Sequence, residues 1–225
     1  ALVAFLRDPE GFRAAFPARA VATLDALEGT DVAFDPRIHA ARPHPGQAAS
    51  ARNLRRLLEG SAVRESHRDC GRVQDAYSLR CMPQVHGAAR EAIAFARSVI
   101  ERELRSVSDN PLVFAAEGAV LSGGNFHGEV LGLALDTLAL GLGQLAGICE
   151  RRIDRLGNPL TNEALPPLLS PHGGVHSGYM IAQYGAAARA SELRPQAGPA
   201  GVEAAPTPGP QGGYNTGAAG AAPRG

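Results

Sequence analysis

The feature that most constrains the fold is a long, mostly apolar segment from about Phe126 to Leu156. Its apolar side chains recur at alternating spacings of four and three, which is the pattern of a helix with one continuous apolar stripe. The stripe consists of Leu131, Leu135, Leu138, Leu142, Leu145 and Cys149. Because Leu133 and Leu140 form a second apolar side, we expect a central bundle helix that is buried on nearly all sides.

The same segment has to be considered as a membrane span, since residues 130–149 have a suitable length. Asp136 and Gln144 lie within it, and an Asp near the centre of a membrane helix costs ~3 kcal/mol. The sequence offers no second candidate span. We therefore expect a helix in a bundle and no membrane partner.

The other segments predict shorter helices. We expect a helix that has Pro17 in its first turn and ends near Gly29, and further helices over 48–58, 84–107 and 178–193. Residues 61–83 lack a clean periodicity and predict an ordered loop or short turns.

One hairpin is expected near 112–121, where two short apolar runs flank Glu117-Gly118. The fold class is therefore all-α with this hairpin added. Residues 1–194 are expected to form the helical domain. Residues 195–225 contain six Pro and eight Gly, so we expect a largely disordered tail.

Composition excludes several classes of function. The chain has 22 basic and 22 acidic residues, and this balance argues against nucleic acid as a partner. Three cysteines, none in a C-x-x-C pair, predict a reduced, cytoplasmic setting without a disulfide framework. His67 and Cys70 match only half of a zinc-site spacing, so we expect no metal.

The first segment whose side chains are suited to binding or catalysis runs from Val73 to Gly87. Gln74, Tyr77 and Arg80 recur every three residues, so one helical turn can direct an amide, a phenol and a guanidinium the same way. Such a trio can bind an amino acid, because Arg grips a carboxylate and a phenol can act as acid or base. A polar helix face with an extended Arg explains the spacing equally well.

The second segment combines residues 108–114 with residues 121–129. Gly123 and Gly124 precede Asn125 and Phe126, and their conformational freedom allows a tight turn that presents both side chains where the long helix begins. A hairpin that merely closes onto a helix requires the same glycines, so this alternative stays open.

Taken together, these segments resemble the aromatic amino acid lyase family, and within it the histidine ammonia-lyases. The similarity covers about Leu24 to Leu193. Its best stretches are FDPRIHAARPHPGQ, SHRDCGRVQDAYSLRCMPQVHGA, SDNPLVF, LSGGNFHGE, ERRIDRL and SGYMIAQYGAAARASE. The phenylalanine-directed relatives carry NFQG where this chain has NFHG, which favours the histidine branch; phenylalanine or tyrosine ammonia-lyase activity is an alternative.

The resemblance implies an all-α long-helix bundle of the aspartase/fumarase-like type, assembled as a cytoplasmic homotetramer. It implies elimination of ammonia from L-histidine to give trans-urocanate, a step of histidine degradation. The family's electrophile is a methylidene-imidazolone made autocatalytically from Ala-Ser-Gly. By the motif match, Tyr77 is the catalytic phenol, while Arg80 and Gln74 bind substrate. Asn125 and Phe126 contact the prosthetic group.

The sequence also departs from the family. Ala-Ser-Gly does not occur in the 225 residues, and the family places it upstream of everything present here. Pro206 to Gly213 stands where the family has a segment of the type PTSANQED, which points to a frameshifted tail. We therefore expect a chain that lacks the N-terminal catalytic half, binds no cofactor by itself and is inactive alone. The alternatives are a non-catalytic helical assembly module, a gene remnant, or one half of a split enzyme.

Overall fold

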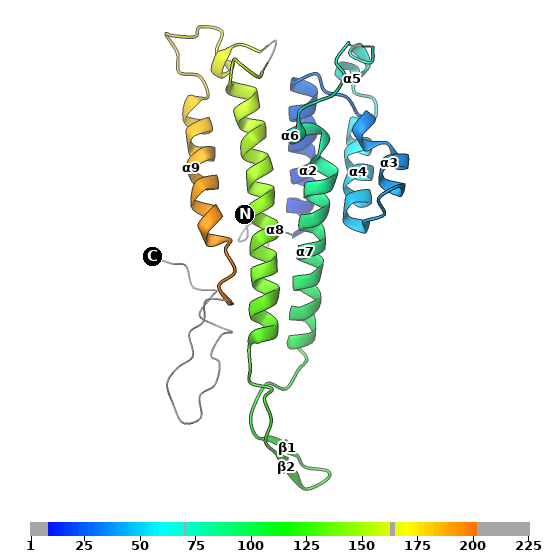
Figure 1. Cartoon of the computed structure of the whole chain (residues 1–225), viewed down its shortest axis with the longest axis vertical. Helices are drawn as coiled ribbons and strands as arrows, with labels where there is room; N and C mark the ends of the chain where they lie inside the picture. Colours follow the sequence, from blue (N-terminus) through cyan, green and yellow to red (C-terminus); the bar gives the residue numbers. More distant parts are fainter. Residues whose placement is uncertain (1–8, 70, 163–164, 202–225) are drawn as a thin grey trace. The chain divides into compact units, whose positions relative to one another are not determined.

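The computed structural model describes residues 9–69, 71–162 and 165–201, with side chains from Pro17 onward. The described chain is mostly helical (Figure 1). In order, its elements are α2 (Pro9–Ala26), η1 (Val32–Phe34), α3 (Pro36–Ala40), α4 (Pro45–Leu58), α5 (Ala62–Ser66), α6 (Tyr77–Arg80), α7 (Met82–Glu103), β1 (Leu112–Phe114), β2 (Ala119–Leu121), α8 (Glu129–Gly157), η2 (Pro167–Leu169) and α9 (Met180–Gln196).

The predicted fold class is confirmed, while several helix boundaries move. The first helix begins at Pro9 and carries Pro17 in its interior, so the prediction of Pro17 in the first turn is wrong. Pro9 takes the initiating position instead, and the backbone hydrogen bond that Pro17 cannot donate is lost within the helix. Helix α9 likewise continues through Pro195, past the expected end near Leu193. Most of the predicted tail, residues 202–225, lies outside the described residues.

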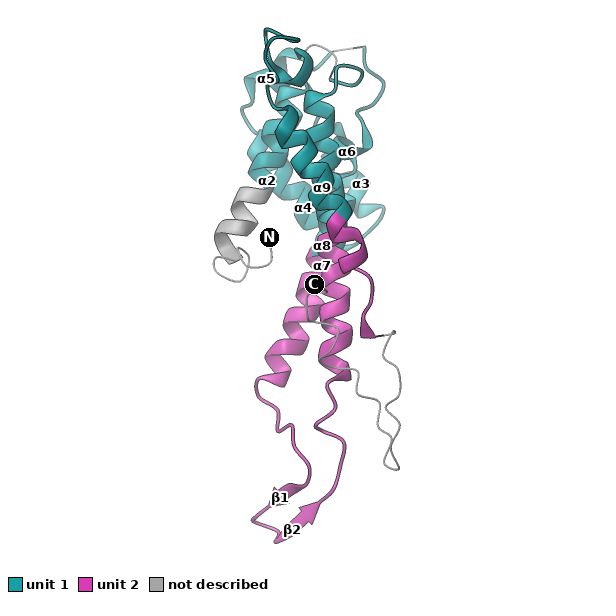
Figure 2. Ribbon diagram, turned by 90° about the vertical axis from the view of Figure 1, so that its left-hand side faces the viewer, with its two compact units in different colours: residues 1–89, 144–191 teal, residues 90–143, 192–225 magenta. Residues whose placement is uncertain are grey.

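The chain forms two compact units (Figure 2). Unit 1 comprises residues 1–89 and 144–191, and unit 2 comprises residues 90–143 and 192–225. Helices α7 and α8 each contribute to both units.

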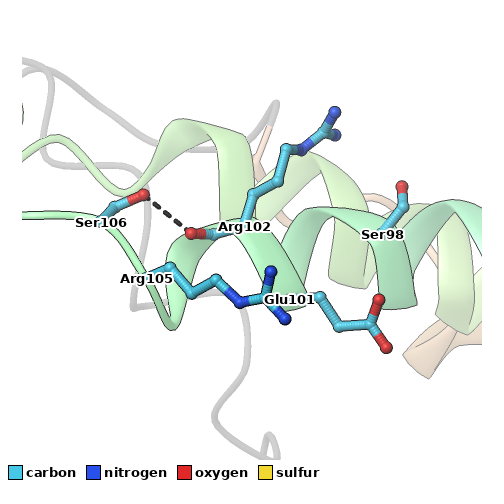
Figure 3. A pocket seen from close by; sticks show the side chains of 5 residues that line it. All are labelled: Ser98, Glu101, Arg102, Arg105 and Ser106. Atoms are coloured by element: carbon cyan, nitrogen blue, oxygen red, sulfur yellow. Dashed lines mark hydrogen bonds between the residues drawn. The ribbon is translucent and has the colours of Figure 1, made fainter.

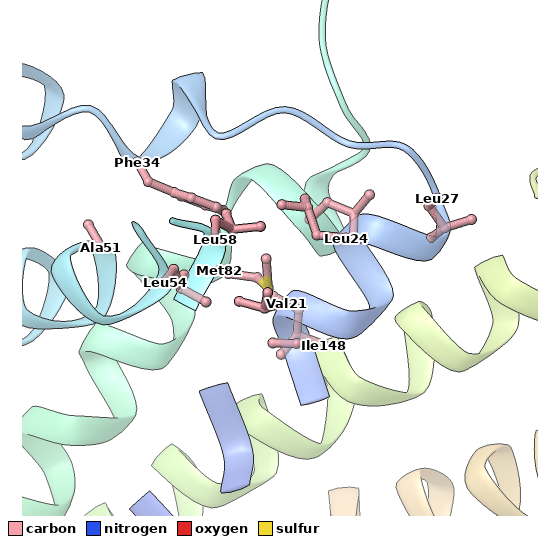
Figure 4. Packing of buried hydrophobic residues seen from close by; sticks show 11 residues of the cluster. Val21, Leu24, Leu27, Phe34, Ala51, Leu54, Leu58, Met82 and Ile148 are labelled. Carbon is pink, nitrogen blue, oxygen red and sulfur yellow. The ribbon is translucent and has the colours of Figure 1, made fainter. Parts of the chain in front are cut away.

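The core of unit 1 is aliphatic and joins elements that are distant in the sequence (Figure 4). Its fully buried large side chains come from α2, η1, α4, α6 and α7, and Ile148 of α8 closes the cluster. They are Leu24, Phe34, Leu54, Leu58, Leu79 and Met82. Burying such side chains stabilises the fold by roughly 1.5–3 kcal/mol each. The inclusion of Leu79 attaches the one-turn helix α6 to this core.

In unit 2, α7 and the first part of α8 pack through small side chains. Ala96, Val99 and Ala134 are buried, with Leu131 and Leu138 against them. The hairpin forms as predicted, with Val113 opposite Val120 and Phe114 opposite Ala119.

Helix α8 is not buried on nearly all sides within this chain, so that prediction is wrong for the single copy. Val130, Leu133 and Leu140 are exposed, because the described chain supplies packing partners for only part of the helix surface. Among the described helices, α8 alone has the length and composition of a membrane span. Its Asp136 accepts hydrogen bonds from the backbone N–H groups of Ala200 and Gly201 at 3.1 and 2.9 Å.

Close backbone contact between α4 and α7 generates the first prediction. A Cβ on Gly87 would come within 2.5 Å of the Gln47 Cα, so Gly87→Ala must push the two helices apart. We expect a loss of about 1–3 kcal/mol in the free energy of unfolding, measured by urea titration. The matched variant Gly147→Ala has open space around its Cβ and should stabilise the chain by about 0.5–1 kcal/mol. Equal changes in the free energy of unfolding for the two variants would contradict the close packing of α7 against α4 at Gly87.

A second prediction follows from the buried His39 in α3. Its Nδ1 lies 3.0 Å from the Gln47 amide nitrogen, and burial lowers the pKa of the imidazole more than nearby Asp35 raises it. The unfolded chain, with a histidine pKa of about 6.5, therefore binds the proton more readily. Stability is fully present above that pH and decreases as the pH falls below it.

The measurement is urea unfolding of the chain between about pH 7 and pH 5. The free energy of unfolding should fall more steeply for the unmodified chain than for His39→Gln. His44→Gln, at an exposed position, should retain the unmodified slope. If the free energy of unfolding of His39→Gln falls with pH as steeply as that of the unmodified chain, groups other than His39 cause the acid sensitivity.

Candidate functional site

Helix α6 presents one side to the core and the other side to solvent. Ser78 and Leu79 are buried, whereas Tyr77 is 71% exposed. The helix consists of a single turn, closed by backbone hydrogen bonds from Leu79 and Arg80 to the Ala76 carbonyl at 3.0 and 2.9 Å. One turn is not stable by itself, so contacts with the rest of unit 1 must hold it in place.

Tyr77 and Arg80 form a pair on this helix, as their spacing of three predicts. The Arg80 Cζ lies 4.6 Å from the centre of the Tyr77 ring, a cation–π arrangement. The Arg80 Nε is buried and makes no hydrogen bond within the described part of the chain. Buried N–H donors in folded proteins nearly always have a hydrogen-bond acceptor, so the Arg80 Nε has an unused donor. The pair thus combines an exposed phenol with a guanidinium that has donor capacity left.

Gln74 lies outside the helical turn. It is exposed and belongs to the irregular segment before α6, so the geometry that joins Tyr77 to Arg80 does not extend to it. Tyr77 and Arg80 therefore share the helical turn, and Gln74 lies in the segment that precedes it.

Asn125 and Phe126 belong to unit 2 and precede the first residue of α8. The Asn125 amide donates to the Val107 carbonyl at 3.4 Å, which ties this turn to the loop that follows α7. Phe126 is 63% exposed, so its ring is available to a group from outside these residues. The two predicted segments fall in different units, and each is described by itself.

Sequence reasoning missed Arg152, which is 5% exposed and lies on α8 within unit 1. Its guanidinium donates to the Cys149 Sγ at 3.2 Å, and it lies 3.3 Å from the His86 Nε2 and 3.5 Å from the Ser78 carbonyl oxygen. Burial lowers the pKa of Arg152, although the neighbouring thiol opposes the shift. Burial also raises the pKa of Cys149, so this thiol is poorly suited to act as a nucleophile.

No group of three or more His, Cys, Asp or Glu within the described ranges could hold a metal ion. The nitrogen Nε2 of His67 lies 2.8 Å from a carboxylate oxygen of Glu28, while Cys70, the other residue of the incomplete zinc-site spacing, lies outside the described residues. An open hollow of about 560 Å³ occurs in unit 2 at the end of α7 (Figure 3). It is lined by Ser98, Glu101, Arg102, Arg105 and Ser106, and it contains none of the predicted site residues.

Comparison with known proteins decides the family. A family model described as "Aromatic amino acid lyase" matches residues 6–224. The chain belongs to the aromatic amino acid lyase family. It is 56% identical over 198 residues to a histidine ammonia-lyase of Koribacter versatilis, covering 83% of this chain and 38% of that protein. It is 53% identical over 190 residues to a histidine ammonia-lyase of Sorangium cellulosum, covering 82% of this chain and 37% of that protein.

Solved structures of the lyase family agree with this assignment. Histidine ammonia-lyase from Trypanosoma cruzi superposes with a TM-score of 0.79 at 42% identity, covering 91% of this chain and 37% of that one. Phenylalanine ammonia-lyase from Rhodosporidium toruloides gives a TM-score of 0.79 at 28% identity, covering 87% of this chain and 29% of that one. The chain thus spans well under half the length of the lyases that it matches.

Proposed function

We propose that this chain carries the substrate-binding Tyr77 and Arg80 of a histidine ammonia-lyase, which eliminates ammonia from L-histidine to give trans-urocanate. The observation that supports this most directly is the exposed Tyr77–Arg80 pair in a chain more than half identical to two curated histidine ammonia-lyases.

The role of Arg80 is to bind the substrate carboxylate. A guanidinium and a carboxylate form paired, charge-assisted hydrogen bonds, and the Arg80 guanidinium lies beside the ring of the exposed Tyr77. Holding the carboxylate beside Tyr77 places the substrate's reacting carbons near a phenol. Binding of this kind converts an encounter in solution into a positioned reaction.

The role of Tyr77 is proton transfer. Elimination removes one proton from the β-carbon and breaks the bond between the α-carbon and nitrogen, with no oxidant or reductant. Tyr77 is exposed on α6 and can exchange a proton with a substrate held by Arg80. Gln74, exposed three residues earlier, is proposed as a further polar contact.

The methylidene-imidazolone of this family, when bound, supplies an electrophile that makes the amino group a better leaving group. These 225 residues contain no Ala-Ser-Gly, so the group must come from another polypeptide segment. The exposed ring of Phe126 fits a contact with such a group, and Asn125 is held next to it by the bond to Val107.

We also propose that the lyase acts as a homo-oligomer, with a tetramer as the family's form, in the cytoplasm. Exposed apolar residues on α8 and α9 support association; they are Val130, Leu133, Leu140, Ile181 and Leu193. The free thiols of Cys81 and Cys149 suit a reducing compartment. The same exposed residues favour a second candidate function, that of a non-catalytic assembly module.

The test uses the purified chain alone and mixed with the Ala-Ser-Gly-bearing segment of a relative such as the Koribacter versatilis enzyme. Urocanate is followed by its ultraviolet absorption. We expect no activity from the chain alone and urocanate formation in the mixture. If the two polypeptides bind each other but form no urocanate, the result would instead support the non-catalytic assembly function.

Variants of the active mixture assign the roles. Tyr77→Phe removes only the hydroxyl and should lower kcat about 100-fold or more. Arg80→Lys should raise KM about tenfold, because the paired hydrogen bonds to the carboxylate are lost. The matched control Tyr184→Phe changes an exposed tyrosine of α9 and should leave both constants unchanged. Full activity in Tyr77→Phe would contradict the proposed mechanism.

A further inference from the structure

The segment that leads into α6 is held by a carboxylate that the proposed reaction does not use. Asp75 precedes the helix by two residues, and its side chain is 1% exposed. One carboxylate oxygen accepts a hydrogen bond from the backbone N–H of Thr30 at 2.7 Å. The other lies 3.4 Å from the Arg72 guanidinium. A buried carboxylate must be paired in this way, because an unpaired one is strongly destabilising.

The carboxylate thereby contacts the loop that follows the C-terminal end of α2. Hydrogen bonds from Glu28 N to the Asp25 carbonyl and from Gly29 N to the Leu24 carbonyl close the helix, with Glu28 at a positive φ of 53°. This is the Schellman arrangement. It leaves the Leu27 and Glu28 carbonyls pointing outward.

Arg72 covers these two carbonyls. Its NH1 donates to the Leu27 oxygen at 3.2 Å and to the Glu28 oxygen at 3.4 Å. A cation is favoured at a helix C-terminus because the aligned peptide dipoles place partial negative charge there. Arg72 and Asp75 together therefore attach the segment before α6 to the residues that directly follow α2.

The segment before α6 lies so close to the loop after α2 that position 29 has no room for a side chain. A Cβ on Gly29 would lie 2.6 Å from the Leu24 Cδ1 and 3.1 Å from the Asp75 carboxylate. Leu24 is fully buried in the core of unit 1. The Asp75 carboxylate therefore lies close to the backbone of Gly29, next to the core residue Leu24.

We propose that Asp75, acting with Arg72, is a positioning residue that fixes the start of α6 and thereby the placement of Tyr77 and Arg80. Leu79 anchors the buried side of the helix, and the Arg152 guanidinium lies 3.5 Å from the Ser78 carbonyl oxygen. Asp75 supplies the attachment at the N-terminal end. An attachment at the N-terminal end limits the movement of a one-turn helix that is otherwise held only from its buried side and its C-terminal end. This role rests on the proposed lyase function for its catalytic consequence.

The first test is hydrogen exchange on the chain itself, which needs no activity. In Asp75→Ala, the amides of Leu79, Arg80 and Cys81 should exchange about tenfold faster, because the Thr30 N–H and Arg72 lose their acceptor. Amides of α4 should keep their rates. Asp75→Asn retains an oxygen for Thr30 but not the charge facing Arg72, so a smaller increase, about threefold, is expected.

The matched control is Asp31→Ala. Asp31 accepts from the Arg64 guanidinium at 3.1 Å and so links the same post-α2 loop to α5, with no connection to α6. It should leave exchange at residues 79–81 unchanged. The proposal is overturned if neither Asp75 variant accelerates exchange there, or if the acceleration is equal in α4, which would indicate general destabilisation. Should Asp75→Ala fail to fold, the Asp75→Asn result decides.

The second test measures kcat and KM in the active mixture, per mole of folded protein. Asp75→Ala should lower kcat about tenfold and raise KM, and Asp75→Asn should recover most of both. A merely structural role would reduce the yield of folded protein and leave both constants unchanged, which would contradict positioning. If the unmodified mixture makes no urocanate, the proposed function fails, whereas the exchange experiment still decides whether Asp75 holds α6.

Discussion

The structure of unit 1 depends on the burial of aliphatic side chains from five helices around α2. A single turn of helix, α6, has no stability without such support, and Leu79 gives it that support from within the core. Everything proposed for Tyr77 and Arg80 requires that this turn keep its position. The burial of Leu79 also leaves the opposite side of the turn in solvent, which is where the phenol stands.

Charged groups add further attachments that hold α6 and the segment before it in place. Arg72 and Asp75 attach the segment before α6 to the residues that directly follow α2, and Arg152 lies against the Ser78 carbonyl from α8. Each group is buried or partly buried, and each joins positions far apart in the sequence. Single buried groups of this kind specify one arrangement of backbone, whereas aliphatic packing tolerates several.

The features that the sequence predicted are those set by local periodicity. The leucine spacing of α8, the hairpin at 112–121 and the spacing of Tyr77 and Arg80 each depend on near neighbours. The anchoring by Asp75 and Arg152 depends on contacts across 45 and 74 positions, and no local pattern reports such contacts. Their presence within the QDAYSLR and ERRIDRL stretches was the only available signal. The exposure of Leu133 and Leu140 was missed for another reason: periodicity shows that a helix surface is apolar, but not which polypeptide covers it.

In the proposed lyase, Arg80 and Tyr77 form the part of the amino-acid site that this chain contributes. The most direct measurement is a crystal structure of the active mixture with trans-urocanate bound. We expect the product carboxylate about 2.7–2.9 Å from guanidinium nitrogens of Arg80, with the Tyr77 hydroxyl facing the carbons of the new double bond. A product bound away from α6, with Arg80 making no contact to its carboxylate, would contradict it.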